Sequence, residues 1–248
     1  MNIAIIGAGA SGLCAAFYAS NNGNHVVVFE RNETAGRKLR ITGNGRCNYS
    51  NEDLSMEHYE HSLGRSSPDF ALSLALEDDM KLISHVIGEA GNGEFTEFLE
   101  NAGILTTKEK GFFYPYTKRA SEMTDTLYRV IARRGVVFRF GHEVRNVSLN
   151  EKGQFLVEGK TFERLILCCG GKAAPKTGSD GGGYKIARNL GHTVSFTYPT
   201  LVGLHIPESG GRSDTEASRF VILQSNGGKK MSEARIFYQE DCNLSLLE

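Results

Sequence analysis

The chain has 248 residues, of which 40% are hydrophobic and 23% are charged, and its formal net charge at pH 7 is −1. This composition is ordinary for a globular protein, and the small net charge argues against a nucleic-acid or membrane surface that depends on bulk charge. No apolar run approaches the ~20 residues that a membrane-spanning helix needs. The five cysteines have neither metal-ligand spacing nor the framework of a secreted domain, so we expect a cytoplasmic protein that binds no metal.

The first 30 residues have the order of a dinucleotide-binding unit. An apolar strand is predicted at Ile3–Ile6, and G-x-G-x-x-G follows at Gly7, Gly9 and Gly12, where a helix begins that extends to about Asn22. The first glycine permits a tight turn, the second lets a pyrophosphate approach the backbone, and the third lets the helix pack against the sheet. The N–H groups at the start of the helix supply partial positive charge for the phosphates.

A second strand is predicted at Val26–Phe29 and ends in Glu30. The carboxylate of Glu30 can accept hydrogen bonds from both hydroxyls of a ribose, which favours FAD or NAD over NADP because a 2′-phosphate would meet a like charge. Arg31 follows directly and would weaken this argument, although one step along the chain turns its side chain away. These residues alone do not separate FAD from NAD, and a glycine-rich turn in an unrelated α/β protein is the alternative.

The rest of the chain alternates between helical and strand patterns. A long loop over 31–51 is rich in Gly, Arg and Asn, and ordered loops of this length are usually functional. Helical patterns occupy 70–76, 81–87, 94–101 and 121–134; strands are predicted at 136–140 and 165–168, and an antiparallel hairpin at 144–149 and 154–157. From about Ser195 only weak strand patterns remain, so we place a domain boundary between 1–194 and 195–248.

The loop contains a second constellation, GRKLRITGNGRCN, at residues 36–48. It places three glycines and four cations in 13 residues. Glycines interleaved with Arg, Thr and Asn suit backbone N–H donors that surround an anion, with cations close by. A solvated basic loop is the alternative interpretation.

This segment closely resembles the signature of the BaiN/YhiN-like flavoproteins, a family of NAD(P)/FAD-dependent oxidoreductases. Two later stretches are similar to that family in the same order, GFFYPYTKRAS at 111–121 and GGKAAPKTGSDGGGY at 170–184. The resemblance extends from Met1 to about Leu204. It implies an α/β fold: a Rossmann-like FAD-binding domain of the two-dinucleotide-binding type, with a central parallel sheet and an antiparallel β-hairpin crossover. The start of a smaller β-rich inserted domain would follow.

The resemblance also implies that FAD is held non-covalently by residues of the matching motifs. The ADP half would contact Gly7, Gly9, Ala10, Gly12 and Glu30, with Arg31 beside them. The pyrophosphate and the flavin would lie along Lys38, Gly43, Gly45, Arg46, Cys47 and Asn48. The backbone of Val144 would meet the adenine. Cys169, Gly170 and Gly171 occupy a corner where the family has Ala-Thr-Gly-Gly, here with cysteines in place of Ala and Thr.

The implied activity is that of an oxidoreductase in which NAD(P)H reduces FAD. The flavin then passes a hydride to a small unsaturated or carbonyl-conjugated molecule. No catalytic acid is assigned, because a flavin can carry the chemistry while the protein orients the substrate. Family members continue past residue 248 with a segment that returns to the FAD domain. A nucleotide-binding remnant or interaction module without turnover is therefore one alternative, and an NAD-binding protein without flavin is another.

Several side chains allow two interpretations. Cys168 and Cys169 could form a vicinal disulfide, but buried cysteine is also a common small apolar residue. Cys47 could be a redox thiol whose pKa is lowered by Arg46 and the nearby amides, or it could pack beneath the flavin. Three side chains of the aromatic segment could face the substrate or the flavin, or could serve only in packing: Tyr114, Tyr116 and Lys118.

Overall fold

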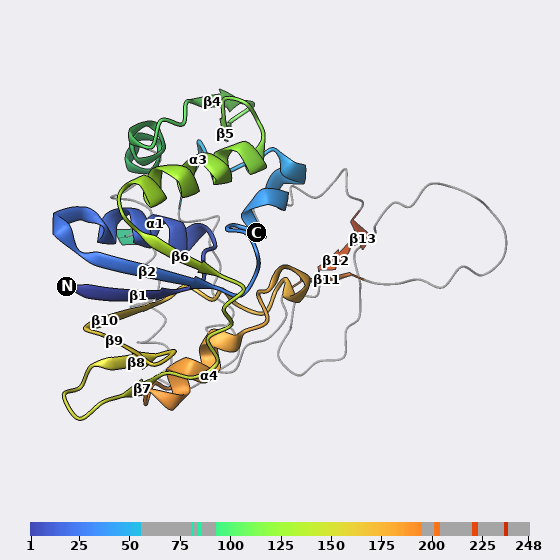
Figure 1. Cartoon of the computed structure of the whole chain (residues 1–248). Helices are drawn as coiled ribbons and strands as arrows, with labels where there is room; N and C mark the ends of the chain where they lie inside the picture. The colour runs from blue at the N-terminus through green and yellow to red at the C-terminus, as the bar shows by residue number, and fades with distance from the viewer. Residues whose placement is uncertain are drawn as a thin grey trace. The chain divides into compact units, whose positions relative to one another are not determined.

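The computed structural model describes residues 1–55, 81, 84–85 and 93–194, together with short strands at 201–203, 220–222 and 236–237 (Figure 1). The chain divides into two compact units, Met1–Glu52 with Glu94–Phe196, and Asp53–Gly93 with Thr197–Glu248. Every residue that the sequence predicts to bind the cofactor lies in the first unit. The helical patterns at 70–76 and at most of 81–87 lie outside the described residues. In the second unit, β11 (Leu201–Gly203), β12 (Phe220–Ile222) and β13 (Ile236–Phe237) form an antiparallel sheet in that order.

A parallel sheet with the strand order β10-β1-β2-β6 forms the centre of the first unit (Figure 1). Its strands are β1 (Asn2–Ile6), β2 (His25–Glu30), β6 (Val137–Phe140) and β10 (Arg164–Leu167). The central strands β1 and β2 are apolar on both faces, as expected for strands covered from both sides. The four strands predicted from the sequence are therefore confirmed, with ends that differ by at most one residue.

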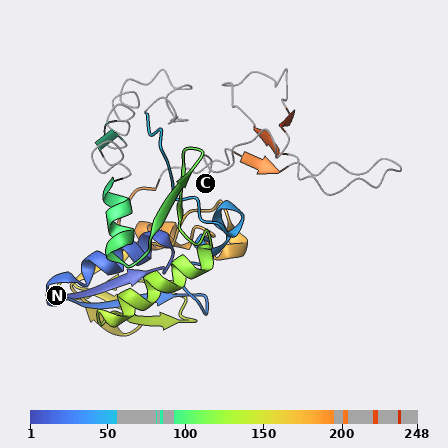
Figure 2. The same ribbon diagram turned by 90° about the horizontal axis from the view of Figure 1, so that it is seen from above.

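Helices cover one face of this sheet (Figure 2). The helix α1 (Ala10–Ala19) ends three residues before the predicted end and is followed by a 3-10 turn at Asn21–Gly23. The helix α3 (Ala120–Arg133) confirms the predicted amphipathic segment, since Met123, Leu127 and Ile131 recur every four residues and are all buried. Residues 93–101 are also helical.

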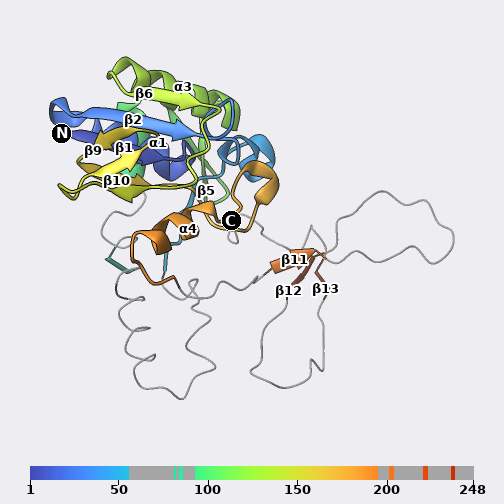
Figure 3. The ribbon, with the colours of Figure 1, turned by 60° about the horizontal axis from the view of Figure 1, so that its bottom comes forward.

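An antiparallel three-stranded sheet and a short helix cover the opposite face (Figure 3). The strands are β7 (Ser148–Leu149), β8 (Phe155–Val157) and β9 (Lys160–Phe162), and the helix is α4 (Gly182–Asn189). Their buried side chains pack against residues of β1 and β2 that point to this face. The predicted hairpin is present with a shorter first strand and gains a third strand, whereas Val144 is buried but lies before β7, outside any strand.

A third sheet joins the end of the signature loop to the aromatic segment. Its strands are β3 (Ser50–Asn51), β4 (Thr106–Glu109) and β5 (Phe112–Pro115), in the antiparallel order β3-β5-β4. The Tyr49 N–H donates to the Phe113 carbonyl over 3.0 Å, so the pairing begins directly after Asn48. This sheet was not predicted, and it brings two motifs together that are about sixty residues apart in the sequence.

Candidate nucleotide-binding site

The three motif glycines have different surroundings. A Cβ on Gly7 would lie 2.2 Å from the Cys168 carbonyl oxygen, and a Cβ on Gly12 would lie 1.9 Å from the Gly7 carbonyl oxygen. Gly7 also has φ +103°, which side chains rarely adopt. A Cβ on Gly9 would meet nothing within 4 Å. The fold therefore requires the first and third glycines, whereas the second faces open space.

This open space adjoins the positive end of α1. Gly9, the residue before the helix, has no side chain to cap it, and the first turn contains no acidic residue. The first four N–H groups of a helix have no partner within the helix, and they create partial positive charge there. The N-terminus of α1 can therefore donate hydrogen bonds to an anion that approaches Gly9.

Glu30 ties the end of β2 to the glycine turn. One carboxylate oxygen, Oε2, accepts from the Ala8 N–H over 2.7 Å, and Oε1 accepts from the N–H and the Nδ2 of Asn32 over 2.8 and 2.6 Å. The side chain is buried, so these bonds are protected from competition with water. A carboxylate oxygen can accept two hydrogen bonds, so Oε2 retains capacity for a donor such as a ribose hydroxyl.

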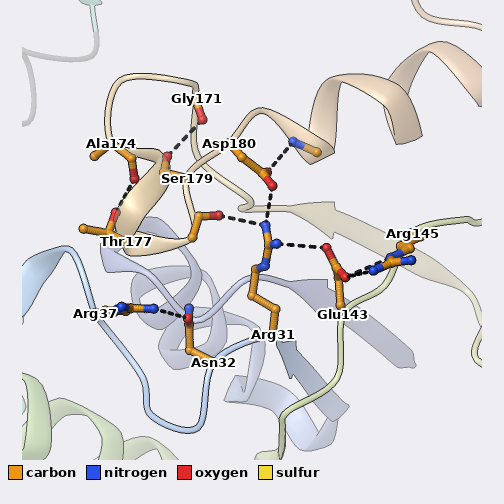
Figure 4. A network of polar contacts seen from close by, with 12 residues as sticks. Arg31, Asn32, Arg37, Glu143, Arg145, Gly171, Ala174, Thr177, Ser179 and Asp180 are labelled. Atoms are coloured by element: carbon orange, nitrogen blue, oxygen red, sulfur yellow. Dashed lines mark hydrogen bonds and ion pairs between the residues drawn. The ribbon is translucent and has the colours of Figure 1, made fainter.

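Arg31 joins three segments of the first unit (Figure 4). Its Nη1 donates to Asp180 over 2.7 Å and to the Gly178 carbonyl over 3.2 Å, and its Nη2 lies 3.0 Å from a carboxylate oxygen of Glu143. Asp180 also accepts from the Gly182 N–H at the start of α4. The hydrogen bond from Arg31 lowers the pKa of Asp180, and the Gly182 N–H adds to the effect. The Arg31 guanidinium is thus part of an ion-pair network. This network connects the end of β2 to the turn that precedes α4.

The four cationic side chains of the signature loop have different interaction partners. Arg37 donates to the side-chain oxygen of Asn32 over 3.1 Å, and Arg40 pairs with Asp125 over 2.6 Å. Arg46 makes a long contact of 3.4 Å with Glu109. Lys38 is half-buried and forms no ion pair with any residue in the described part of the chain. Lys38 therefore remains available to an anion.

The loop turns back on itself between Thr42 and Asn48. Gly43 has φ +54°, and a Cβ there would lie 2.9 Å from the Asn48 nitrogen. Among the residues that the structure describes, the side-chain oxygen Oδ1 of Asn48 is buried and has no hydrogen-bond partner. Buried polar atoms in native proteins nearly always have a partner, so this oxygen is suited to accept from a bound ligand.

Of the two interpretations of Cys47, the structure does not support a redox thiol with a lowered pKa. Cys47 is buried against α3, with its Sγ 3.4 Å from the Met123 Sδ, and burial raises the pKa of the thiol. Arg46 does not offset this effect, because its guanidinium turns toward Glu109 and Tyr114. The structure therefore favours packing over redox chemistry for Cys47.

The corner at Cys168 and Cys169 contains two free thiols and no disulfide. The Gly170 φ of +72° confirms the tight turn predicted after this strand. Burial is the main cause that raises the pKa of Cys169 to about 11, and neighbouring charges add to it. The pKa of Cys14 on α1 is raised to about 11 for the same principal reason.

We expect these thiols to react slowly in the native protein. Only the thiolate is alkylated, and at about pH 8 a thiol with a pKa near 11 holds about a hundredfold less thiolate than an ordinary cysteine. Iodoacetamide at that pH should modify Cys14 and Cys169 about a hundredfold more slowly in the folded chain than in urea, as measured by peptide mass spectrometry. Equal rates in the two conditions would contradict the burial that the structure shows.

The aromatic segment splits into a buried and an exposed part. Tyr114 is 9% exposed, whereas Tyr116 is 68% exposed. Lys118 has φ +51° and pairs with Glu109, a residue to which sequence reasoning gave no role. In the described ranges, no group of His, Cys, Asp and Glu could hold a metal ion, and no helix is both long and apolar enough to cross a bilayer.

A parallel sheet, a glycine turn at an open helix N-terminus and a buried acid at the end of β2 together define a dinucleotide-binding Rossmann domain. The family model described as the HI0933-like protein Rossmann domain matches residues 1–234, and the chain belongs to this family. This membership confirms the family resemblance that the signature motifs predicted.

Two curated relatives and one solved structure give further comparisons. The chain is 35% identical to the 3-dehydro-bile acid delta(4,6)-reductase of Clostridium scindens over 91% of this chain and 55% of the relative. It is 28% identical to the ribosomal RNA dihydrouridine synthase of Escherichia coli over 81% of this chain and 46% of the relative. The chain therefore spans about half the length of these relatives. The open conformation of a flavocytochrome c3 fumarate reductase matches with a TM-score of 0.53 and 17% identity, over 77% of this chain and 40% of that one, which shows the shared fold.

Proposed function

We propose that this chain is the FAD-binding part of a reductase that adds hydrogen to a carbon–carbon double bond conjugated to a carbonyl group of a small molecule. The observation that carries the proposal is the open space beside Gly9, at the uncapped N-terminus of α1. The fold itself does not require glycine at this position, because a Cβ there would meet no other atom within 4 Å. Residues 1–194 would form the FAD-binding domain, and 195–248 would begin a β-rich inserted domain.

Residues of the first unit offer groups that would suit each part of FAD. Oε2 of Glu30 can accept from the ribose, the N-terminus of α1 and Lys38 can bind the pyrophosphate, and the unpartnered Oδ1 of Asn48 can accept a donor of the ribityl–flavin half. The remaining contacts would come from backbone and small side chains, at Gly7, Ala10, Gly12, Gly43, Gly45, Cys47, Val144, Cys169, Gly170 and Gly171. Arg31 and Arg46 would lie beside the cofactor. Bound FAD would supply the hydride. The chain itself would orient the substrate and exclude water.

The relatives support the reaction class. The names of both curated relatives denote the addition of hydrogen to a carbon–carbon double bond, in a bile acid or in uridine. We favour a small-molecule substrate because the identity to the bile-acid reductase is higher and because the net charge of −1 does not suit an RNA partner. NAD(P)H is the proposed electron donor. The four described cysteines are free, which suits a reducing cytoplasmic setting.

The first test is the visible absorption spectrum of the purified chain and a titration with FAD. We expect uptake of FAD, and we expect Lys38→Met to weaken it about tenfold, since a charge-assisted contact to phosphate contributes about 1.5–3 kcal/mol. Arg37→Met is the matched control, because Arg37 is exposed and bonds to Asn32, and it should change the affinity little. Quenching of FAD fluorescence measures the FAD affinity of the unaltered chain and of the two variants.

The outcomes separate the competing functions. A folded chain that takes up NADH but no FAD would favour an NAD-binding protein without flavin. A folded chain that binds neither nucleotide would favour a remnant or an interaction module. If Lys38→Met binds FAD as tightly as the unaltered chain, then Lys38 does not contact the pyrophosphate.

A further inference from the structure

Two neighbouring residues of α3 contact the signature loop, residues 36–48. A Cβ on Gly36 would lie 2.4 Å from Cγ2 of Thr124, so the start of the loop packs on the helix with no room for a side chain. The next residue of α3 is Asp125, and its Oδ1 accepts a hydrogen bond from Nη2 of Arg40 over 2.6 Å. The helix therefore contacts the loop at two points that are four residues apart.

The side chain of Arg40 is directed to protein groups on either side of it. Its Nε donates to the Ala35 carbonyl over 2.9 Å, and its Nη2 donates to Asp125. Its backbone N–H donates to the Gly36 carbonyl over 2.8 Å. The side chain is 24% exposed, so it is largely withdrawn from solvent. A cation-rich loop suggests phosphate contacts for every cation, whereas this geometry gives Arg40 the work of connecting the loop to α3.

Lys38 lies between the two anchored residues of the loop. On one side, Gly36 packs on α3, and its N–H donates to the Ala8 carbonyl in the glycine turn over 2.8 Å. On the other side, Arg40 is tied to α3 by its ion pair. A long side chain binds a phosphate more tightly when the backbone that carries it is already fixed, because less freedom is lost on binding. The contacts with α3 supply this order for Lys38.

We propose that Asp125 is a positioning residue for the cofactor, which holds the signature loop through Arg40 so that Lys38 reaches the pyrophosphate. This inference rests on the proposed FAD-binding function and adds to it a residue of α3 that lies outside the motifs of the cofactor site. Asp125 acts through Arg40 and does not itself touch FAD. Without the ion pair, Lys38 reaches the pyrophosphate in a minority of the chains, so the FAD affinity falls toward that of a chain without Lys38.

Two other roles of the ion pair lead to different results. If Arg40 were a phosphate ligand, Asp125 would compete with FAD for the guanidinium, and removal of its charge would strengthen FAD binding. If the pair served the fold alone, its loss would lower stability and leave the FAD affinity of the folded chain unchanged. The two side chains are 24% and 41% exposed, and ion pairs with such access to solvent contribute little to stability. Stability and affinity can therefore be measured separately.

The test measures FAD affinity by fluorescence quenching at a temperature at which every variant is folded. Asp125→Asn and Arg40→Met should each weaken FAD binding about fivefold, and the double variant should bind no more weakly than either single variant, because all three lack the same interaction. Asp125→Glu keeps the charge and should retain most of the affinity. The urea midpoint of Asp125→Asn should differ from that of the unaltered chain by less than about 0.5 M.

A double-mutant cycle between Asp125 and Lys38 tests whether the loop transmits the effect. Lys38→Met should weaken FAD binding about tenfold in the unaltered chain but only about twofold in the Asp125→Asn variant, since few chains of that variant place the ammonium at the pyrophosphate. Independent contributions to the fold would instead multiply.

Glu122→Gln is the matched control on the same helix. It removes one negative charge and breaks the exposed pair of Glu122 with Arg119, and it should leave FAD affinity unchanged. The proposal is overturned if Asp125→Asn strengthens FAD binding or leaves it unchanged, or if the effects of Asp125→Asn and Lys38→Met multiply. A failure of the proposed function is a different result, because the unaltered chain would then take up no FAD.

Discussion

The substitution Gly12→Ala is expected to prevent stable folding of the first unit. The new methyl group would lie 1.9 Å from the Gly7 carbonyl oxygen and 2.9 Å from the carbonyl carbon, and neither backbone atom can move without displacing the turn from β1. Overpacking against backbone at a fixed turn costs more than about 3 kcal/mol, which is a large part of the stability of a typical domain. Urea denaturation followed by circular dichroism measures the loss.

The same substitution at Gly9 should leave the fold intact and impair ligand binding. A Cβ on Gly9 meets nothing within 4 Å, and alanine accepts the observed φ of −74°. Stability should change by at most about 1 kcal/mol, because alanine is a poorer residue than glycine at the start of a helix. ADP and FAD should bind at least about tenfold more weakly, since the methyl group occupies the approach of the pyrophosphate. Full affinity of Gly9→Ala for ADP would show that the pyrophosphate lies elsewhere.

The second large effect is expected at Glu30. Glu30→Ala removes the acceptor of three N–H donors, and the buried Ala8 N–H loses its partner. The free energy of unfolding should fall by about 2–4 kcal/mol, and FAD binding by the folded protein should weaken by about 1.5–3 kcal/mol. Thermal unfolding and FAD titration at low temperature measure the two effects separately.

Glu33→Ala is the matched control for Glu30→Ala. It removes the same charge three residues further on, where the carboxylate is exposed beside Gly141. Stability should change by less than about 0.5 kcal/mol, as for most surface substitutions. A fully stable Glu30→Ala variant with unchanged FAD affinity would remove both roles that we give to this carboxylate.

The sequence was informative where local signals determine the structure. The apolar run of β1, the glycine spacing and the acid at the end of β2 are all set within thirty residues, and the structure shows each of them as predicted. The resemblance of the signature motifs to a known family predicted the crossover sheet and the family membership. The roles of the candidate cofactor residues remain predictions that the nucleotide titrations test.

Contacts between distant residues were not predictable in the same way. Asp180 lies in a glycine-rich stretch that suggests a ligand loop, and nothing local shows that it pairs with Arg31, 149 residues earlier. The β4–β5 hairpin did offer a signal. Lys110 and Gly111 form its two-residue turn, and both have positive φ. The two strands that the turn connects are equally long. Such turns usually contain Asn-Gly or Asp-Gly, and lysine in the first position concealed this one.

The strand order of the parallel sheet has a consequence for the sequence of events during synthesis. β1 is made first, yet it lies between β2, which follows within thirty residues, and β10, which ends at Leu167. Until β10 has left the ribosome, one edge of β1 exposes unpaired backbone groups next to apolar side chains, a state that favours pairing with other chains. The glycine turn also takes shape late, because Cys168, the residue after β10, packs against Gly7 and donates to the Ile6 carbonyl over 2.7 Å. The nascent chain should therefore gain the ability to bind a nucleotide only after Cys168 has been translated.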